Sequence, residues 1–94
     1  MIRPLKPDRI PCCVIGCGRT ASKEWAGNNT EIICGPHWRM VNKHLRSRYR
    51  RCWRLIKKAR ARNSEVALRY LYRVENEVWE KIKADANNVA VGIG

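Results

Sequence analysis

Hydrophobic residues return every three or four positions along the second half of the chain, which is the period of an amphipathic helix. Between residues 43 and 62 they are Leu45, Tyr49, Cys52, Ile56 and Ala59, with Trp53 beside them. The opposite side of a helical wheel drawn for this segment is filled with Lys and Arg. No Gly or Pro occurs between residues 37 and 91. The pattern therefore predicts a basic amphipathic helix over residues 43–62.

A second helix is expected over residues 64–86. Its apolar positions are Ala67, Leu71, Val74, Val78 and Ile82, flanked by Leu68 and Trp79. Asn63, Ser64 and Glu65 predict a break followed by a new helix start, because serine caps helix N-termini and an acid there favours the helix dipole. Two antiparallel helices joined by a tight turn can bury both apolar stripes. Residues 87–94 carry no helix signal and are expected to form a flexible tail.

The first 42 residues have a different texture. Residues 1–11 contain three prolines together with Arg3, Lys6 and Arg9, which predicts a basic N-terminal arm. Between residues 12 and 37, short apolar pieces alternate with turn residues, which indicates a knuckle and a short hairpin rather than a helix. Pro36 suits the first turn of a further short helix, because proline lacks only an N–H that has no partner there. Asn42 is expected to separate that short helix from the basic helix.

Cysteine and histidine residues form two clusters in the first part of the chain. Cys12, Cys13 and Cys17 come first, and the second cluster is the pair Cys34 and His37. Tetrahedral zinc takes four thiolate or imidazole ligands, supplied as close pairs with a loop between them. By spacing alone, either Cys12 or Cys13 can pair with Cys17.

Two other assignments compete with this zinc site, and Cys52 is interpreted separately. An iron–sulfur cluster is disfavoured because a Cys-x2-His pair is typical of zinc. His44 is a weaker alternative to His37 as the histidine ligand. Cys52 lies on the apolar stripe of the basic helix, so we interpret it as a small buried hydrophobic residue.

The segments Cys12-Cys13-Val14-Ile15-Gly16-Cys17 and Cys34-Gly35-Pro36-His37-Trp38 resemble the small zinc module common in bacteriophage and bacterial proteins. That module has the pattern Cys-x4-Cys, then Cys-x2-His followed by an aromatic residue. The resemblance implies a treble-clef-like fold and one structural Zn²⁺ held by Cys12, Cys17, Cys34 and His37, with Cys12 chosen over Cys13. Where such a module precedes an HNH-type nuclease, a second His/Asn group follows. The only further histidine here is His44, so nuclease activity is not expected.

Together these patterns predict a small α+β fold, mostly α, in one domain over residues 1–94. Its parts are a basic arm (1–11), a zinc module (12–42), a basic antiparallel helical hairpin (43–86) and a flexible tail (87–94). A metal staple is common in chains this short, whose apolar core is small. Glu24 and Glu31 are the only acidic residues between residues 9 and 64, and neither has a recognisable catalytic partner. The protein is therefore not expected to be an enzyme.

The formal net charge is +12, and it is concentrated before residue 63. Eleven basic and no acidic residues lie between Arg39 and Arg62. Like charges four positions apart on a helix each cost a few tenths of a kcal/mol, so an anionic partner is expected to compensate them. Together with the resemblance to the bacteriophage zinc module, this charge predicts a phage-type regulatory protein that binds DNA or RNA. The residues expected to make this contact are Arg39, Lys43, Arg46, Arg50, Arg51, Arg54, Lys57, Lys58 and Arg62.

The alternative function is a protein-binding adaptor or inhibitor that docks on an acidic surface of a host enzyme such as RNA polymerase. Four tryptophans are many for 94 residues. Trp38 and Trp53 are expected in the core, whereas Trp25 or Trp79 can anchor an interface if it is exposed. No secretory signal or membrane-spanning run is visible, so the expected location is the cytoplasm, that of the host if the resemblance holds, with no membrane partner.

Overall fold

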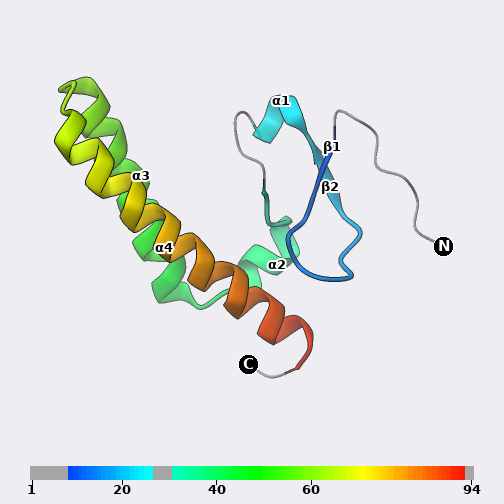
Figure 1. Ribbon diagram of the computed structural model, residues 1–94. Coiled ribbons are helices and arrows are strands. Elements are labelled where there is room, and N and C mark those ends of the chain that lie inside the picture. The colour runs from blue at the N-terminus through cyan, green and yellow to red at the C-terminus, as the bar shows by residue number, and fades with distance from the viewer. Residues whose placement is uncertain (1–8, 27–30, 93–94) are drawn as a thin grey trace.

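The computed structural model describes residues 9–26 and 31–92 (Figure 1). The described part is mostly helical, with one two-stranded antiparallel hairpin. Its elements in chain order are β1 (Arg9–Pro11), β2 (Thr20–Ser22), α1 (Lys23–Ala26), α2 (Gly35–Met40), α3 (Lys43–Ala61) and α4 (Glu65–Ala90). Over the described residues, no helix combines the length and apolar character needed to cross a membrane.

The β-hairpin begins before the first cysteine. Ile10 lies opposite Ala21 in the ladder, and the Arg9 guanidinium donates hydrogen bonds of 3.0 Å to both the hydroxyl and the carbonyl oxygen of Thr20. The sequence pattern places residues 9–11 in the basic arm, and the structure corrects this, because these residues pair with β2 across the knuckle. Residues 1–8 of the predicted arm lie outside the described residues.

A single turn of helix, α1, follows β2 directly. The Ser22 hydroxyl accepts a hydrogen bond of 3.2 Å from the Trp25 backbone N–H, and Glu24 lies in the first turn. Both features favour a helix start. The prediction of no helix between residues 12 and 37 before Pro36 is therefore wrong for Lys23–Ala26. Ala26 is buried with Ile10 and Ile32 in a small core beside the β-hairpin.

The predicted break at Asn42 is confirmed. Helix α2 ends at Met40, and the Asn42 side chain caps α3 by accepting a hydrogen bond of 2.8 Å from the His44 backbone N–H. The turn after α3 also follows the prediction: Asn63 has a φ of 52°, and the Ser64 hydroxyl accepts from the Ala67 backbone N–H at 3.4 Å. Asparagine is among the few residues that tolerate the left-handed conformation.

Helices α3 and α4 form the antiparallel hairpin that the two apolar stripes predict. Cys52, Ile56 and Ala59 are the buried residues of α3, and Val78, Ile82 and Ala86 are those of α4. The prediction that helical structure ends at residue 86 is wrong, because α4 continues to Ala90. Ala86 is buried against the knuckle, and the Asn87 amide donates a hydrogen bond of 2.9 Å to the Lys83 carbonyl oxygen.

The main core lies where the C-terminal half of α4 meets the knuckle. Its buried members are Cys12, Val14, Val41, Val78, Ile82 and Ala86. Figure 1 shows α4 running from the tip of the hairpin to the knuckle, with α2 beside its C-terminal half. Two of the predicted metal ligands, Cys17 and Cys34, are packed against this core. The candidate metal site and the helical hairpin of α3 and α4 are therefore parts of one packed unit.

Candidate metal centre and basic helix

The first pair of cysteines lies on a tight knuckle between β1 and β2. The Cys12 backbone N–H donates to the Arg19 carbonyl oxygen at 2.8 Å, and the Cys17 N–H donates to the Val14 carbonyl oxygen at 3.1 Å. Gly16 has a φ of 79°, a conformation that residues with a Cβ rarely adopt. This glycine lets the chain reverse between Cys12 and Cys17, so that both residues can contribute to one site.

The second pair lies at the start of α2. Cys34 is the N-cap residue of this helix, and its carbonyl oxygen accepts a hydrogen bond of 2.9 Å from the Trp38 N–H, so His37 lies one turn further along. The Cys34 backbone N–H donates to the Cys12 sulfur at 3.4 Å. This contact joins the two pairs.

The four predicted donors come together in space. The sulfur atoms of Cys12, Cys17 and Cys34 and a ring nitrogen of His37 all lie within 4.8 Å of one another. The Cys17 and Cys34 sulfur atoms are 3.7 Å apart, and the His37 Nδ1 is 3.1 Å from the Cys34 sulfur and 3.8 Å from the Cys12 sulfur. A disulfide bond is about 2.05 Å long, so these cysteines are not bonded to each other.

These distances fit a metal ion at the centre of the group. In a tetrahedral site with Zn–S bonds of about 2.3 Å, two sulfur atoms are about 3.8 Å apart. The observed separation of 3.7 Å between Cys17 and Cys34 is close to that edge length. Three thiolates and one imidazole can therefore hold a single metal ion here without a change of fold.

The thiols of the knuckle have different acidities. Burial raises the pKa of Cys12, but the backbone N–H groups of Cys34 and Val14 and the His37 and Cys17 side chains outweigh it and lower the pKa to about 7. Burial raises the pKa of Cys17 above its usual value. Because the thiolate is the form that binds metal, Cys12 is the ligand that loses its proton most readily of these two.

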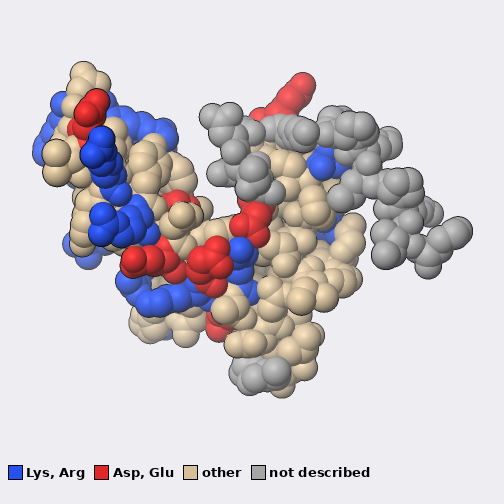
Figure 2. All heavy atoms as spheres, viewed as in Figure 1, with Lys and Arg blue, Asp and Glu red and all other residues tan. Residues whose placement is uncertain are grey.

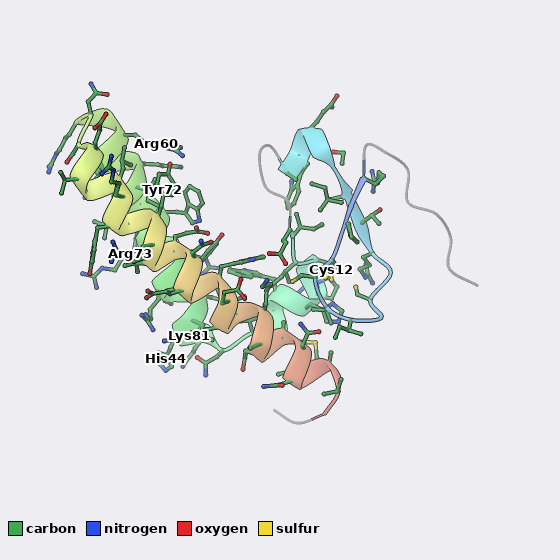
Figure 3. The ribbon with its side chains drawn as sticks, in the orientation of Figure 1. Cys12, His44, Arg60, Tyr72, Arg73 and Lys81 are labelled. Carbon is green, nitrogen blue, oxygen red and sulfur yellow. The ribbon has the colours of Figure 1, made fainter. Side chains whose placement is uncertain are left out.

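Cys13 is separate from the four-donor group. Its backbone N–H donates to the Ile32 carbonyl oxygen at 2.8 Å, and burial, followed by the charges of Cys12 and Glu31, raises its thiol pKa to about 11. Cys52 is buried in the hairpin, as expected, where its thiol donates to the Leu71 carbonyl oxygen at 3.4 Å. His44 is exposed on α3, away from Cys12 (Figure 3). The structure thus places neither Cys13 nor His44 among the candidate ligands.

The predicted basic residues divide into two groups. Eight are exposed, and Figure 2 shows Lys and Arg side chains over much of the hairpin. Arg46 is half-buried, and its Nε donates a hydrogen bond of 3.1 Å to the Val41 carbonyl oxygen, so it holds the start of α3 in place. We define the basic face as those of the predicted residues that are exposed on α3 and its C-cap: Lys43, Arg50, Arg51, Arg54, Lys57, Lys58 and Arg62. Arg39 is exposed on α2 and lies outside this definition.

Arg60 has a structural role. The only sign of it in the sequence is that Arg60 lies beside the apolar stripe of the basic helix. Its guanidinium lies 5.9 Å from the centre of the Trp53 ring and 5.6 Å from that of the Tyr72 ring. Its Nε also donates a hydrogen bond of 2.9 Å to the Tyr72 hydroxyl, and Figure 3 shows the two side chains side by side. Arg60 therefore links α3 to α4 through its hydrogen bond to the Tyr72 hydroxyl, with its guanidinium near the Trp53 ring of its own helix.

Ion pairs do not neutralise the basic face. Over the residues that the structure describes, the only ion pairs are those of Lys83, with Glu31 at 2.9 Å and with Glu80 at 3.1 Å. Both acids and the lysine lie outside α3. The positive charges of the basic face thus have no carboxylate partner within this part of the chain.

Comparisons with known proteins give no match: no protein-family model, no curated protein and no solved structure matches the chain. A group of three cysteines and one histidine does not by itself identify a particular zinc-finger family. The four-donor group and the basic face are therefore the observations on which a functional proposal rests.

Proposed function

We propose that the protein is a small zinc-stabilised regulatory protein that binds nucleic acid, DNA or RNA, through the basic face of α3. The observation that carries this proposal is the set of seven exposed Lys and Arg residues on one helix face, without a carboxylate partner among the described residues. Such a face repels itself, and a polyphosphate backbone is the common biological surface that relieves this repulsion.

Zinc is the metal we assign to the four-donor group, in a structural role. Three thiolates and one imidazole match the ligand set of structural zinc sites, and four protein ligands leave no open position for a substrate. A knuckle and a β-hairpin, followed by a helix with one ligand at its N-cap and one in its first turn, support a treble-clef-like arrangement. We accordingly propose that the protein is not an enzyme.

The length and composition of the basic face suit contacts along a phosphate backbone. Helix α3 has 19 residues and is about 28 Å long, so it can lie along several successive phosphates. Arginine predominates among its cations, and guanidinium groups contact phosphate oxygens in pairs. The helix contains no Asn or Gln, the residues that read adenine. We therefore propose binding in which phosphate contacts predominate.

The test is fluorescence anisotropy of the zinc-loaded protein with labelled duplex DNA, single-stranded DNA and RNA across a salt series. Each phosphate contact contributes a slope of about −0.9 for duplex DNA, or −0.7 for a single strand, to log K against log salt. Replacing Arg50, Arg54 and Lys58 by Gln should make the slope shallower by about 2 to 3. Affinity that does not depend on salt, or no binding at low salt, contradicts the proposal.

A charge-matched control separates the basic face from net charge. Arg69, Arg73 and Lys81 are exposed on α4, and replacing all three by Gln removes the same charge. This control should keep most of the salt slope, whereas the slope of the α3 variant becomes shallower by about 2 to 3. Equal losses in the two variants would show that net charge, and not the basic face, carries the binding.

The alternative function is an adaptor or inhibitor that docks on an acidic surface of a host enzyme such as RNA polymerase. The observation that favours it is Trp25, whose side chain is 72 % exposed although tryptophan is a frequent interface anchor. A partner retained after nuclease treatment at moderate salt would support this role. Under either function, the resemblance to the phage-type zinc module supports the proposal of a phage protein in the host cytoplasm, without a membrane partner.

A further inference from the structure

A cleft lies between the metal-binding part of the chain and the helical hairpin. Its volume is about 540 Å³, within the usual range for sites that take small ligands or side chains. We call it the aromatic cleft; its walls include Trp25, Trp38, Tyr49 and Trp79, with the carboxylates of Glu31 and Glu75. Among the residues that the structure describes, no Lys or Arg lines it. Figure 2 shows acidic side chains gathered between the hairpin and the remainder of the molecule.

The rings of the cleft are inclined to one another. The Trp38 and Tyr49 ring centres are 5.9 Å apart at an angle of 64°, and those of Tyr49 and Trp79 are 5.6 Å apart at 37°. A flat nucleobase is held best between parallel faces, and this geometry offers none among the three rings. A cation is attracted to the face of each ring separately, so inclined rings can share one.

The two carboxylates of the cleft are not equivalent. Glu31 is already paired with Lys83 at 2.9 Å, and it accepts a hydrogen bond of 3.4 Å from the Trp79 indole. Glu75 is half-buried and accepts one hydrogen bond of 3.1 Å from the Tyr49 hydroxyl, through Oε1. Among the described residues, no Lys or Arg is paired with Glu75.

Burial, and then the nearby Glu75 carboxylate, raise the pKa of Tyr49 to about 12, so the tyrosine stays protonated and remains the donor. The Glu75 carboxylate therefore keeps an oxygen for a further partner, within an aromatic and partly desolvated hollow.

Guanidinium is the cation that suits these surroundings best. It stacks on aromatic faces and donates two parallel hydrogen bonds to a carboxylate, which a compact ammonium group cannot do. The same molecule already holds one guanidinium near an indole, because the Arg60 guanidinium lies 5.9 Å from the centre of the Trp53 ring. The cleft is also larger than one guanidinium group, which leaves room for the flanking peptide.

We propose that the aromatic cleft binds an arginine side chain presented by a basic peptide segment of a partner protein. The guanidinium stacks on the rings of the cleft and pairs with Glu75. This binding site is distinct from the basic face and does not depend on the proposed nucleic-acid function. The protein can thereby hold a basic polypeptide in the cleft and a polyanion on α3 at the same time.

The probe for this site is a capped Gly-Arg-Gly peptide, followed by two-dimensional ¹H–¹⁵N NMR of the indole N–H groups. The signals of Trp38 and Trp79 should shift in a saturable manner, whereas Trp53, which does not line the cleft, should change little. The same peptide with citrulline has a neutral urea group of similar shape and should bind far more weakly. No saturable shift up to about 10 mM peptide, or equal binding of the citrulline peptide, overturns the proposal.

A pair of variants tests the role of Glu75. Glu75→Gln keeps an acceptor for the Tyr49 hydroxyl but removes the charge, so the dissociation constant for the arginine peptide should rise at least about tenfold. Glu77→Gln removes a charge from an exposed residue of the same helix that does not line the cleft, and it should leave the constant unchanged. Unchanged binding in Glu75→Gln would overturn the assigned role and the proposal with it.

Discussion

At the scale of single residues, Cys12 joins the candidate metal site to the apolar core. Its sulfur accepts the Cys34 backbone N–H, and the residue is buried with Val78, Ile82 and Ala86 of α4. An ionised sulfur is costly in such surroundings unless an opposite charge accompanies it. A bound metal cation supplies that charge, so metal binding and core packing are expected to depend on each other.

The corresponding prediction compares the same substitution, Cys to Ser, at two cysteines. Cys34→Ser removes one of four donors and should abolish binding of one equivalent of zinc. Because metal binding supplies folding free energy, the substitution should also unfold the knuckle and the β-hairpin. Cys13→Ser changes a thiol outside the group and should retain both. Metal content by mass spectrometry and near-ultraviolet circular dichroism measure the two effects. A Cys34→Ser protein with full zinc content and an unchanged melting temperature would contradict the assignment.

At the scale of secondary-structure elements, α4 holds the molecule together. The C-terminal half of this helix forms polar contacts with three separate segments. Asn87 accepts from the Ile15 N–H at 2.9 Å, Asp85 accepts from the Asn42 N–H at 2.8 Å, and Lys83 pairs with Glu31. The same half contributes Val78, Ile82 and Ala86 to the main core. Helix α4 is thus the scaffold against which the candidate metal site is assembled.

Two isoleucines provide a matched test of this scaffold. Ile56 and Ile82 are both 0 % exposed, but only Ile82 belongs to the core cluster that includes Cys12. Either change to Ala should lower the free energy of unfolding by about 2–5 kcal/mol, measured by urea denaturation. Only Ile82→Ala should also weaken zinc binding, measured by competition with a chelator. Equal zinc affinity in the two variants would show that α4 does not support the metal site.

The sequence predicts those elements that show a pattern over many neighbouring residues or a defined spacing of ligands. Both long helices, the breaks at Asn42 and Asn63, and the meeting of Cys12, Cys17, Cys34 and His37 follow from periodicity and from ligand spacing. The choice of Cys12 over Cys13 needed the family resemblance, because spacing permits both. Helix α1 has too few residues for a periodic pattern.

Other features depend on partners that are distant along the chain. Residues 87–90 continue α4, although Asn87 and Asn88 have modest helix propensity, and the contact with Ile15 spans 72 positions. The walls of the aromatic cleft come from α1, α2, α3, α4 and the segment before α2, so no local pattern predicts them.

At the scale of the whole molecule, repulsion between positive charges opposes the stability that the apolar core provides. The formal net charge is +12, and a row of like charges runs along α3 at every fourth residue, from Arg46 through Arg50 and Arg54 to Lys58. The aromatic cleft is a local exception, because the described residues that line it include two carboxylates and no cation. The folded protein therefore brings like charges together on α3, and any anion that screens them should stabilise the protein.

This repulsion predicts that salt stabilises the zinc-loaded protein without any nucleic acid. Raising ionic strength from about 0.01 M to 0.15 M shortens the screening length from about 30 Å to 8 Å. Charges four positions apart are about 6 Å from each other, so this change screens roughly half of the repulsion in the three like-charge pairs along α3. At a few tenths of a kcal/mol per pair, the gain is about 0.5 kcal/mol, or a rise of about 2–4 °C in melting temperature. Calorimetry measures the rise, and the variant with Gln at positions 50, 54 and 58 should show much less of it. A melting temperature that falls with salt would contradict this balance.

The position of α4 in the chain also has a consequence for biosynthesis. The four metal donors lie between residues 12 and 37, whereas Val78, Ile82 and Ala86, which cover Cys12, are made much later. Because ribosomes add about 5–20 residues per second, the interval between His37 and Ala86 lasts several seconds. During that time the nascent chain carries its thiols without the helix that buries one of them. The timing of zinc capture relative to the synthesis of α4 therefore decides how long these cysteines are open to oxidation.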